Sequence, residues 1–312
     1  MLYLLLASFL TFVELNCENL FDCRHDSLKD DLQFLPEGSY NWTPYRYWKK
    51  INHTAQTILS CSGSNSDPIL PDIVALVEVE NDTVMHDLTR RSLLRNAKYE
   101  YIITSSPDVR GIDVALLYQP LSFRPVSHTS IRVPMPEGVR PTRDILYVQG
   151  ITINGTMLHI FVVHAPSRAS GEAVTQKYRN LVAGKVVEKI DSIVSDDAEA
   201  QIIVTGDFND YASGSSLICY QSRGLVNVST EAKGRAVAKG TYRYQGDWGS
   251  LDHFIVSRNI SSDVCCYIND AAFLLEEDEK YGGYKPRRNY LGPQWRNGYS
   301  DHLPLVMKWN IQ

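Results

Sequence analysis

The sequence has no excess of positive charge. Its 31 lysine and arginine residues are outnumbered by 36 aspartate and glutamate residues, which gives a formal net charge of −5. A protein that coats nucleic acid over a broad face needs a basic surface, so the composition argues against that class of protein. A catalyst needs only a local positive rim. The negative sign also fits a carboxylate-rich site that a divalent cation partly neutralises.

The sequence also lacks the features of a zinc domain and of a chain divided into several domains. None of its six cysteines forms a CxxC pair, and no histidine lies at zinc-finger spacing from them. No stretch rich in proline, glycine and serine suggests a linker, and no internal repeat is present. We therefore predict one domain over residues 1–312. Nothing in the sequence demands an oligomer, so we expect a monomer.

The apolar run at the N-terminus, Tyr3–Phe12, is too short to cross a membrane, so we expect no stable membrane insertion. It resembles the core of a signal peptide, but no positive residue precedes it. The run also leads directly into the first predicted strand, which ends at Asn16. Residues 1–12 are therefore either a signal-peptide remnant or an edge strand. The compartment stays open between secreted or periplasmic and cytoplasmic.

The order of the apolar runs predicts a mixed α/β fold. Apolar residues at helical spacing mark Arg46–Ser60, and a longer helix is expected from about Gly171 to Val194. Continuous apolar runs at Asp72–Val79 and Gln201–Thr205 indicate buried strands, and Asn154-Gly155 between two β-rich runs indicates a hairpin turn. Strands outnumber helices, which favours two packed sheets with helices outside over a doubly wound parallel sheet. Further strands are expected at Leu10–Phe21, Tyr99–Ser105, Asp113–Tyr118, Thr241–Tyr244, Leu251–Ser257, Val264–Ile268 and Leu303–Trp309, and a further helix from Asn81 to about Arg95.

Polar side chains recur where the predicted strands begin or end. Rigid strand ends hold side chains precisely, which makes these positions candidates for a site. Taken singly, each has an ordinary explanation as a solvated strand end or a turn former. The ordered set is harder to explain in that way. Its members are Asn16, Glu78, His164, Asp207 with Asn209, Asp252, and Asp301 with His302.

These residues lie in the segments LNCENLFD, ALVEVEN, VVHAPSR, TGDFND, SLDHFIVS and SDHLP, in that order along nearly the whole chain. Their content and order resemble the endonuclease/exonuclease/phosphatase superfamily. The resemblance is closest to its uncharacterised or secreted bacterial branch, and more distant to pancreatic deoxyribonuclease and exonuclease III. It implies a DNase I-like α/β fold, a four-layer α/β/β/α sandwich of two mixed, mainly antiparallel sheets with helices outside.

Hydrolysis of an anionic phosphodiester needs charge neutralisation, an aligned water and protonation of the leaving oxygen. Glu78 offers a hard oxygen ligand and is expected to be the principal metal residue. The resemblance places Asn16 beside it and lets Asp301 join through water. Mg²⁺ suits such an oxygen-rich, partly hydrated site, and Mn²⁺ can substitute for it.

Four further strand-end residues are expected to serve proton transfer and phosphate contact. His302 is the candidate general base or phosphate contact, and Asp252 is expected to fix its tautomer and raise its basicity. Asp207 would orient the water or protonate the leaving group. Asn209 is neutral and would hold the phosphate without adding negative charge.

The resemblance also makes His164 an acid near the leaving oxygen. In deoxyribonuclease-like members, the acidic neighbour of this histidine follows a short arginine-containing stretch before a strand. Asp113 in DVRGIDVALLY is similarly placed, so we expect it to orient His164.

Cationic and aromatic residues near these segments are candidates for substrate contact, as phosphate ligands or a stacking wall. Each also has an ordinary explanation, as a solvated charge or a packing residue. The candidates are Arg168 in APSRAS, Arg110 in RGID, Arg287 and Arg288 before SDH, and Tyr242 before SLDH.

The sequence thus predicts an Mg²⁺-dependent phosphodiester hydrolase of nuclease-like type, with nucleic acid as the first candidate substrate. One alternative is a phosphodiesterase or phosphatase for a lipid headgroup or a small phosphorylated metabolite. Another is a binding module of the same fold without catalysis, although no acidic member of the set is missing. The segment GIDVALLY lacks the tyrosine of the DNA-repair branch, which argues against abasic-site repair.

Overall fold

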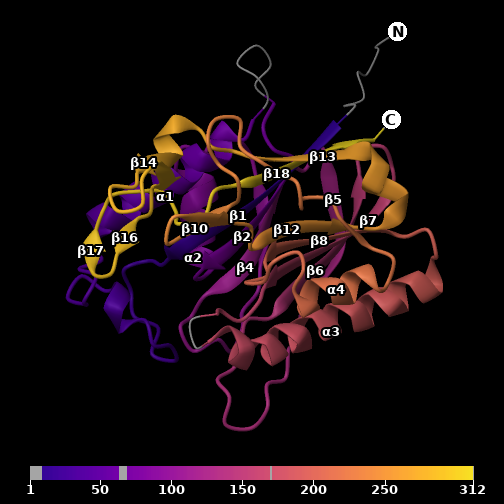
Figure 1. The fold of residues 1–312 in the computed structure, drawn as a ribbon, viewed down its shortest axis with the longest axis horizontal. Helices are drawn as coiled ribbons and strands as arrows, with labels where there is room; N and C mark the ends of the chain where they lie inside the picture. The colour runs from indigo at the N-terminus through magenta and orange to yellow at the C-terminus, as the bar shows by residue number, and fades with distance from the viewer. Residues whose placement is uncertain (1–8, 63–68, 169–170, 312) are drawn as a thin grey trace.

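The strands form two large sheets that share one pairing pattern (Figure 1). The structure is a computed structural model, and it describes residues 9–62, 69–168 and 171–311. Within these residues each large sheet has six strands, and one parallel pair lies among antiparallel pairs: β1 with β2 in sheet A, and β7 with β8 in sheet B. This confirms the predicted mixed, mainly antiparallel sheets.

The elements have the following bounds. In spatial order, sheet A contains β13 (Val264–Ile268), β18 (Leu305–Asn310), β1 (Phe9–Leu20), β2 (Ile73–Val79), β4 (Asp113–Tyr118) and β3 (Glu100–Ile103). Sheet B contains β5 (Phe123–Ile131), β6 (Ile145–Thr152), β7 (Met157–His164), β8 (Gln201–Asp207), β12 (Asp252–Val256) and β9 (Val226–Asn227). Short hairpins are β10 (Tyr242–Tyr244) with β11 (Asp247–Gly249), β14 (Leu275–Glu277) with β15 (Tyr284–Pro286), and β16 (Tyr290–Leu291) with β17 (Gln294–Trp295). The helices are α1 (Pro44–Ser60), α2 (Asp82–His86), α3 (Glu172–Asp196) and α4 (Ser215–Gln221), with single-turn segments at Leu32–Phe34, Asp87–Arg91, Arg258–Asp263 and Ala272–Leu274.

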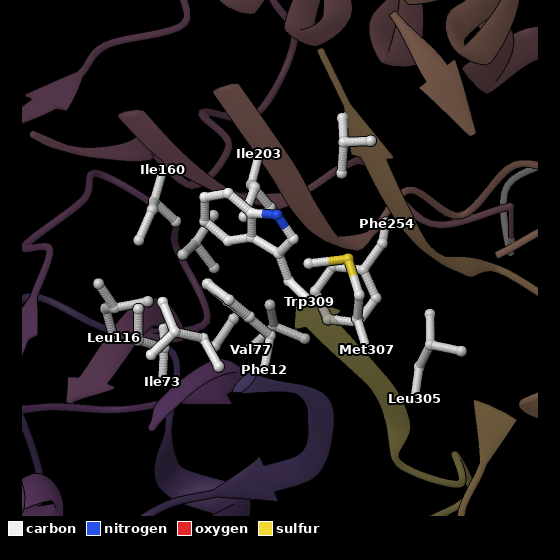
Figure 2. Packing of buried hydrophobic residues seen from close by; sticks show 14 of the residues in the cluster. Phe12, Ile73, Val77, Leu116, Ile160, Ile203, Phe254, Leu305, Met307 and Trp309 are labelled. Carbon is white, nitrogen blue, oxygen red and sulfur yellow. The ribbon is translucent and has the colours of Figure 1, made fainter. Parts of the chain in front are cut away.

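Three apolar cores stack these elements in four layers. The first fills the space between the sheets, where Phe12, Met307 and Trp309 of sheet A pack with Ile203 and Phe254 of sheet B (Figure 2). The second packs α1 and α2 on the outer face of sheet A. The third packs α3 and α4, which run close together in Figure 1, on the outer face of sheet B. The predicted α/β/β/α sandwich is therefore confirmed.

Covering of both faces explains why the central strands read as continuous apolar runs. Side chains alternate across a strand. In β2, Ile73, Ala75 and Val77 enter the core between the sheets, whereas Val74 and Leu76 pack towards α1. A strand buried on both sides cannot show the polar alternation of a half-exposed strand.

Several elements were not predicted from the sequence, among them β5, α4 and most of the short hairpin strands. β5 is exposed along most of its length, so it lacks a buried apolar run. α4 has only seven residues, too few for a clear helical period. The helix expected from Asn81 to about Arg95 is shorter than predicted, because α2 ends at His86 and the one π-helical turn after it ends at Arg91.

The strand at the N-terminus is an interior strand. From Phe9 onwards β1 pairs with β18 on one side and with β2 on the other. The edge-strand alternative is therefore wrong for these residues, because the last strand of the chain returns to cover the open side of β1. Residues 1–8 lie outside the described residues, and the single domain over residues 1–312 stays a prediction. Among the described helices, none is long and apolar enough to cross a membrane.

Gly206 occupies a position in β8 that only glycine fits. Its φ is +133°, and a Cβ added there would lie 1.9 Å from the carbonyl oxygen of Val163 in the paired strand β7. A side chain would therefore force apart the two central strands just before Asp207.

We expect Gly206→Ala to lower the free energy of unfolding by about 3 kcal/mol, because clash and backbone strain add at one buried position. Gly184→Ala is the matched control, since an added Cβ at this position in α3 meets nothing within 4 Å. There alanine should raise the free energy of unfolding by about 0.5–1 kcal/mol. Urea unfolding of both variants measures the difference, and equal effects would contradict this account.

Candidate active site

Residues from both sheets line one cleft of about 620 Å³. Most of the predicted site residues lie there. They are Asn16, Glu78, Arg110, His164, Arg168, Asp207, Asn209, Tyr242, Arg288, Asp301 and His302. Six further lining residues were not singled out from the sequence: Glu18, Asn19, Ser167, Glu172, Tyr211 and Leu251.

Two irregularities shape one wall of this cleft, one in the pairing of β1 with β2 and one in the pairing of β2 with β4. The register between the strands shifts after Asn16, and β2 has an irregularity at Glu78 in its pairing with β4. Glu78 has a φ of +61°, and Glu18 and Asn19 have φ values of +49° and +58°. Non-glycine residues rarely adopt this left-handed conformation. Strained backbone of this kind gathers at functional sites, because it aims side chains that a regular strand would not.

Asp252 and His302 form the predicted pair at the base of the cleft. His302 Nδ1 lies 2.7 Å from Asp252 Oδ2, which also accepts a hydrogen bond from the Thr241 hydroxyl. Burial by itself would lower the pKa of His302, but attraction to Asp252, and then to Asp207 and Asp301, holds that pKa well above its usual range. Attraction to these carboxylates therefore favours the imidazolium form of His302 in the metal-free protein.

Helix α1 and strand β1 hold the segment that delivers Asp301 and His302. The buried Lys50 ammonium donates to the carbonyl of Tyr299, and His53 Nδ1 lies 2.7 Å from the carbonyl oxygen of Gly298. The Ser300 hydroxyl donates to the carbonyl of Asn16 at 2.6 Å and accepts from His302 N at 3.1 Å. The helical pattern of α1 gave no hint of these contacts, since they depend on a segment more than 200 residues away.

Asp207 lies buried among amide donors. Its Oδ2 accepts from Asn16 Nδ2 at 3.1 Å and from Asn209 Nδ2 at 3.3 Å, and its Oδ1 accepts from Asn209 N at 2.8 Å. Burial and the charge of Asp252 raise the pKa of Asp207 to about 7, against the lowering effect of His302. Asp207 can therefore gain or lose a proton near neutral pH, as either a water-activating or an acid role requires.

His164 faces Glu78 and Asp207. Its Nε2 lies 3.7 Å from Glu78 Oε1 and 3.9 Å from Asp207 Oδ2. Burial lowers the pKa of His164 well below its usual range, and the positive charges of Arg143, Arg110 and His302 lower it further. Burial and these three positive charges therefore favour the neutral form of the His164 imidazole.

The expected contact between Asp113 and His164 is not made. The Asp113 carboxylate accepts hydrogen bonds from the Thr104 hydroxyl and from Ser106 N at 3.1 and 3.2 Å. His164 Nδ1 is buried and has no hydrogen-bond partner among the described residues. Asp113 is thus used to fix the loop that follows β3, and it does not line the cleft.

Glu78 contributes a carboxylate to the lining of the cleft. One of its oxygens, Oε2, accepts from Asn19 N at 2.9 Å, while Oε1 faces the cleft beside His164. Asp301 also lines the cleft. A second group of the described residues, Asp207, Asp252 and His302, has potential ligand atoms within 4.8 Å of one another. The atoms of this group lie close enough together to hold one metal ion, and the carboxylates of Glu78 and Asp301 offer oxygen ligands of the type that hard divalent cations prefer.

Three arginines, Arg110, Arg168 and Arg288, line the cleft together with these carboxylates. The Arg168 guanidinium lies 4.5 Å from the ring centroid of Tyr211, and Arg288 Nη2 lies 3.0 Å from Asp301 Oδ2. Arg287, also predicted to contact substrate, instead lies over the ring of Tyr299, 5.7 Å from its centroid, and does not line the cleft. Adjacent residues in an extended segment point in opposite directions, so only one of the two arginines can face the site.

We expect Asp207→Asn to stabilise the metal-free protein at alkaline pH. A folded-state pKa of about 7 exceeds the unfolded value of about 3.9. The contribution of Asp207 to wild-type stability should therefore fall as pH rises from about 4 through 7, because burying the ionised carboxylate is costly. Asparagine does not titrate, so its advantage should grow over that window and then level off. Thermal unfolding in EDTA from pH 4 to 8 measures this, and a pH-independent difference would contradict it.

Comparison with protein families identifies one family model. The model, described as the Endonuclease/Exonuclease/phosphatase family, matches residues 11–310 of this chain. A comparison with curated proteins gave no match.

Several solved structures share this fold. An endonuclease/exonuclease/phosphatase family protein from Bacteroides thetaiotaomicron is 17% identical, with 96% of this chain and 97% of that chain covered and a TM-score of 0.62. A mannosyl-6-phosphatase from the same organism is 18% identical, with 96% and 98% covered and a TM-score of 0.62. The catalytic domain of human Nocturnin, solved with a bound sulfate anion, is 17% identical, with 97% and 94% covered and a TM-score of 0.59.

At this level of identity the solved structures show the fold, and the family model carries the assignment. Because that model spans nearly the whole chain, this protein belongs to the Endonuclease/Exonuclease/phosphatase family, a family of hydrolases that cleave phosphate esters.

Proposed function

We propose that this protein is an Mg²⁺-dependent phosphodiester hydrolase of nuclease-like type. The observation that carries the proposal is the Asp252–His302 pair, in which His302 Nδ1 lies 2.7 Å from Asp252 Oδ2. His302 lines a cleft that is also lined by Glu78 and Asp207. A paired imidazolium, a carboxylate that titrates near neutral pH and an oxygen ligand are the groups that phosphodiester hydrolysis needs.

The metal would be held by Glu78, with Asp301 joining through water. A divalent cation at this position would neutralise phosphate charge and favour the ionised forms of the nearby carboxyl groups. Asn16 was predicted as a third metal residue. Its Nδ2 donates to Asp207, and its Oδ1 accepts from Glu18 N at 2.8 Å. The Asn16 side chain therefore holds Asp207 and the backbone of Glu18 in place, and its Oδ1 is also an oxygen that could bind the metal.

Proton transfer falls to Asp207 and phosphate contact to His302. The raised pKa of His302 keeps it positive, so it would bind a non-bridging phosphate oxygen. Asp207, ionised above about pH 7, would orient the attacking water and accept its proton. Asn209 and neutral His164 would add hydrogen bonds to the phosphate or the leaving oxygen without changing the net charge. The proton that Asp207 takes from the water would pass to the leaving oxygen as its bond to phosphorus breaks, so the leaving group departs as an alcohol.

A phosphatase or phosphodiesterase for a small phosphorylated metabolite or a lipid headgroup is the second candidate. The cleft is compact, at about 620 Å³, and its arginines are gathered inside it. Nucleic acid is usually bound along an extended cationic track. A mannosyl-6-phosphatase shares the fold, which is consistent with a small substrate.

Hydrolysis of bis(p-nitrophenyl) phosphate and of plasmid DNA tests the proposal. We expect both substrates to be cleaved with Mg²⁺ or Mn²⁺ and neither with EDTA. His302→Ala should lower kcat by about 10²–10⁴-fold, the usual contribution of a positioned acid–base group. His128→Ala, which changes an exposed histidine on β5, should leave the rate unchanged.

The outcomes separate the alternatives. Cleavage of the small ester alone would favour a metabolite or lipid substrate over nucleic acid. Equal activity of the His302 and His128 variants would exclude the proposed role of the Asp252–His302 pair. Absence of turnover by folded, metal-loaded protein on a broad panel of phosphoesters would favour a binding module.

The metal assignment has its own test. We expect Glu78→Gln to weaken Mn²⁺ binding by at least about tenfold, because it removes an anionic oxygen ligand. Glu277→Gln, at an exposed carboxylate of β14, is the control and should bind Mn²⁺ as the wild type does. Titration calorimetry on metal-free protein measures both. Equal affinities in the two variants would move the metal to the group of Asp207, Asp252 and His302.

A further inference from the structure

Glu18 is a buried carboxylate that the proposed reaction does not use. Its side chain is 6% exposed, and its backbone adopts the left-handed conformation at the irregularity that ends β1. Three donors from one short segment converge on it. Asn289 N lies 2.6 Å from Oε2, and Tyr290 N and Arg288 Nε lie 3.3 and 3.4 Å from Oε1.

This arrangement connects the first strand to a segment about 270 residues later in the chain. Arg288 and Asn289 lie in the connection between the short strands β15 and β16, and Tyr290 is the first residue of β16. These strands pair only within their own two-stranded hairpins, so neither large sheet fixes the place of this segment at the cleft. The buried Glu18 carboxylate, which accepts hydrogen bonds from two backbone N–H groups of this segment, holds the segment in place instead. Glu18 therefore sets where this connection lies relative to Asn16 and Glu78.

Arg288 is the member of the segment that reaches the cleft. Its Nη2 donates to Asp301 Oδ2 at 3.0 Å, and its Nε faces Glu18, so two carboxylates fix the plane of the guanidinium. Nη1 has no hydrogen-bond partner among the residues that the structure describes, and the residue lines the cleft. A planar cation held on two edges with a further donor free is suited to bind an oxyanion.

We propose that Glu18 is the positioning residue for Arg288, and that through it Arg288 is fixed as a phosphate-binding group of the cleft. This inference rests on the proposed function, since it assigns the phosphate of the substrate to the same cleft. The inference goes beyond the proposed function because it attributes part of the affinity for phosphate to Glu18, a residue that takes no part in the reaction. A purely structural role is the alternative, in which Glu18 closes the loop and Arg288 only neutralises Asp301.

Inorganic phosphate is the probe that separates these roles. Its dissociation constant would be measured by titration calorimetry at pH 8 with Mg²⁺ present, for the wild type, Glu18→Gln, Arg288→Ala and the double variant. We expect each single change to weaken phosphate binding by about tenfold or more, because each removes a charge-assisted hydrogen bond. The double variant should bind phosphate within about twofold of Arg288→Ala, since Glu18 acts only through Arg288.

Asp22→Asn is the matched control. Asp22 is also buried, lies close to Glu18 in the sequence and accepts a backbone hydrogen bond, from Arg24 N at 2.6 Å, but it does not line the cleft. Its substitution is expected to lower the melting temperature without changing the affinity for phosphate. If Glu18→Gln does not fold, Glu18→Asp serves instead, because it keeps the charge and shortens the reach by one methylene.

Three results would overturn the proposal. They are wild-type affinity in the folded Glu18 variant, additive losses in the double variant, and absence of phosphate binding by the wild type. The proposed function is tested separately by turnover of bis(p-nitrophenyl) phosphate. Phosphate binding with the expected pattern but without turnover would remove the proposed function and leave the Glu18–Arg288 connection in place.

Discussion

Repulsion between carboxyl groups that are buried together is the constraint on which this site depends. Glu14, Asp207 and Asp252 lie within electrostatic reach of one another beneath the cleft, and burial followed by mutual repulsion raises the pKa of Glu14 well above its usual range and that of Asp207 to about 7. His302 is the counter-charge at their centre, bonded to Asp252 at 2.7 Å. Such a cluster is stable only if partners hold it together, and it is a natural place for added positive charge, whether a metal ion or an arginine.

The fold supplies those partners from elements that are distant in the sequence. β1 carries Glu14, Asn16 and Glu18 towards the cleft, while β8 and β12 bring Asp207 and Asp252 side by side through their antiparallel register. α1 holds the segment before His302 from the opposite side. Packing of the two sheets, rather than any single element, therefore sets the distances between the catalytic candidates. A side chain at position 206, which would push apart the two central strands of sheet B, would therefore also displace Asp207 in the site.

Much of the fold was predictable because its central strands are covered on both faces and appear as uninterrupted apolar runs. The hairpin at Asn154-Gly155 was predictable as well, because a tight turn needs a residue with positive φ and the sequence places glycine there. In the structure Gly155 has a φ of +88° between the paired strands β6 and β7. β5 was not predicted, because most of its residues are exposed and form no apolar run. The site followed from the ordered motifs, but side-chain direction did not: Asp113 bonds Thr104 and Ser106, and Arg287 turns to Tyr299.

The sequence by itself determined which chemical groups are available and that strand ends present them, because apolar periodicity and motif order are local properties of the chain. Only the tertiary structure decided which of these groups meet. It pairs His302 with Asp252, leaves His164 neutral among Arg143 and Arg110, and ties Arg288 to Glu18. Burial, charge state and contact depend on residues brought together from distant parts of the chain. The physical reason is that desolvation and Coulomb attraction act through space, whereas a sequence pattern records only neighbours along the backbone.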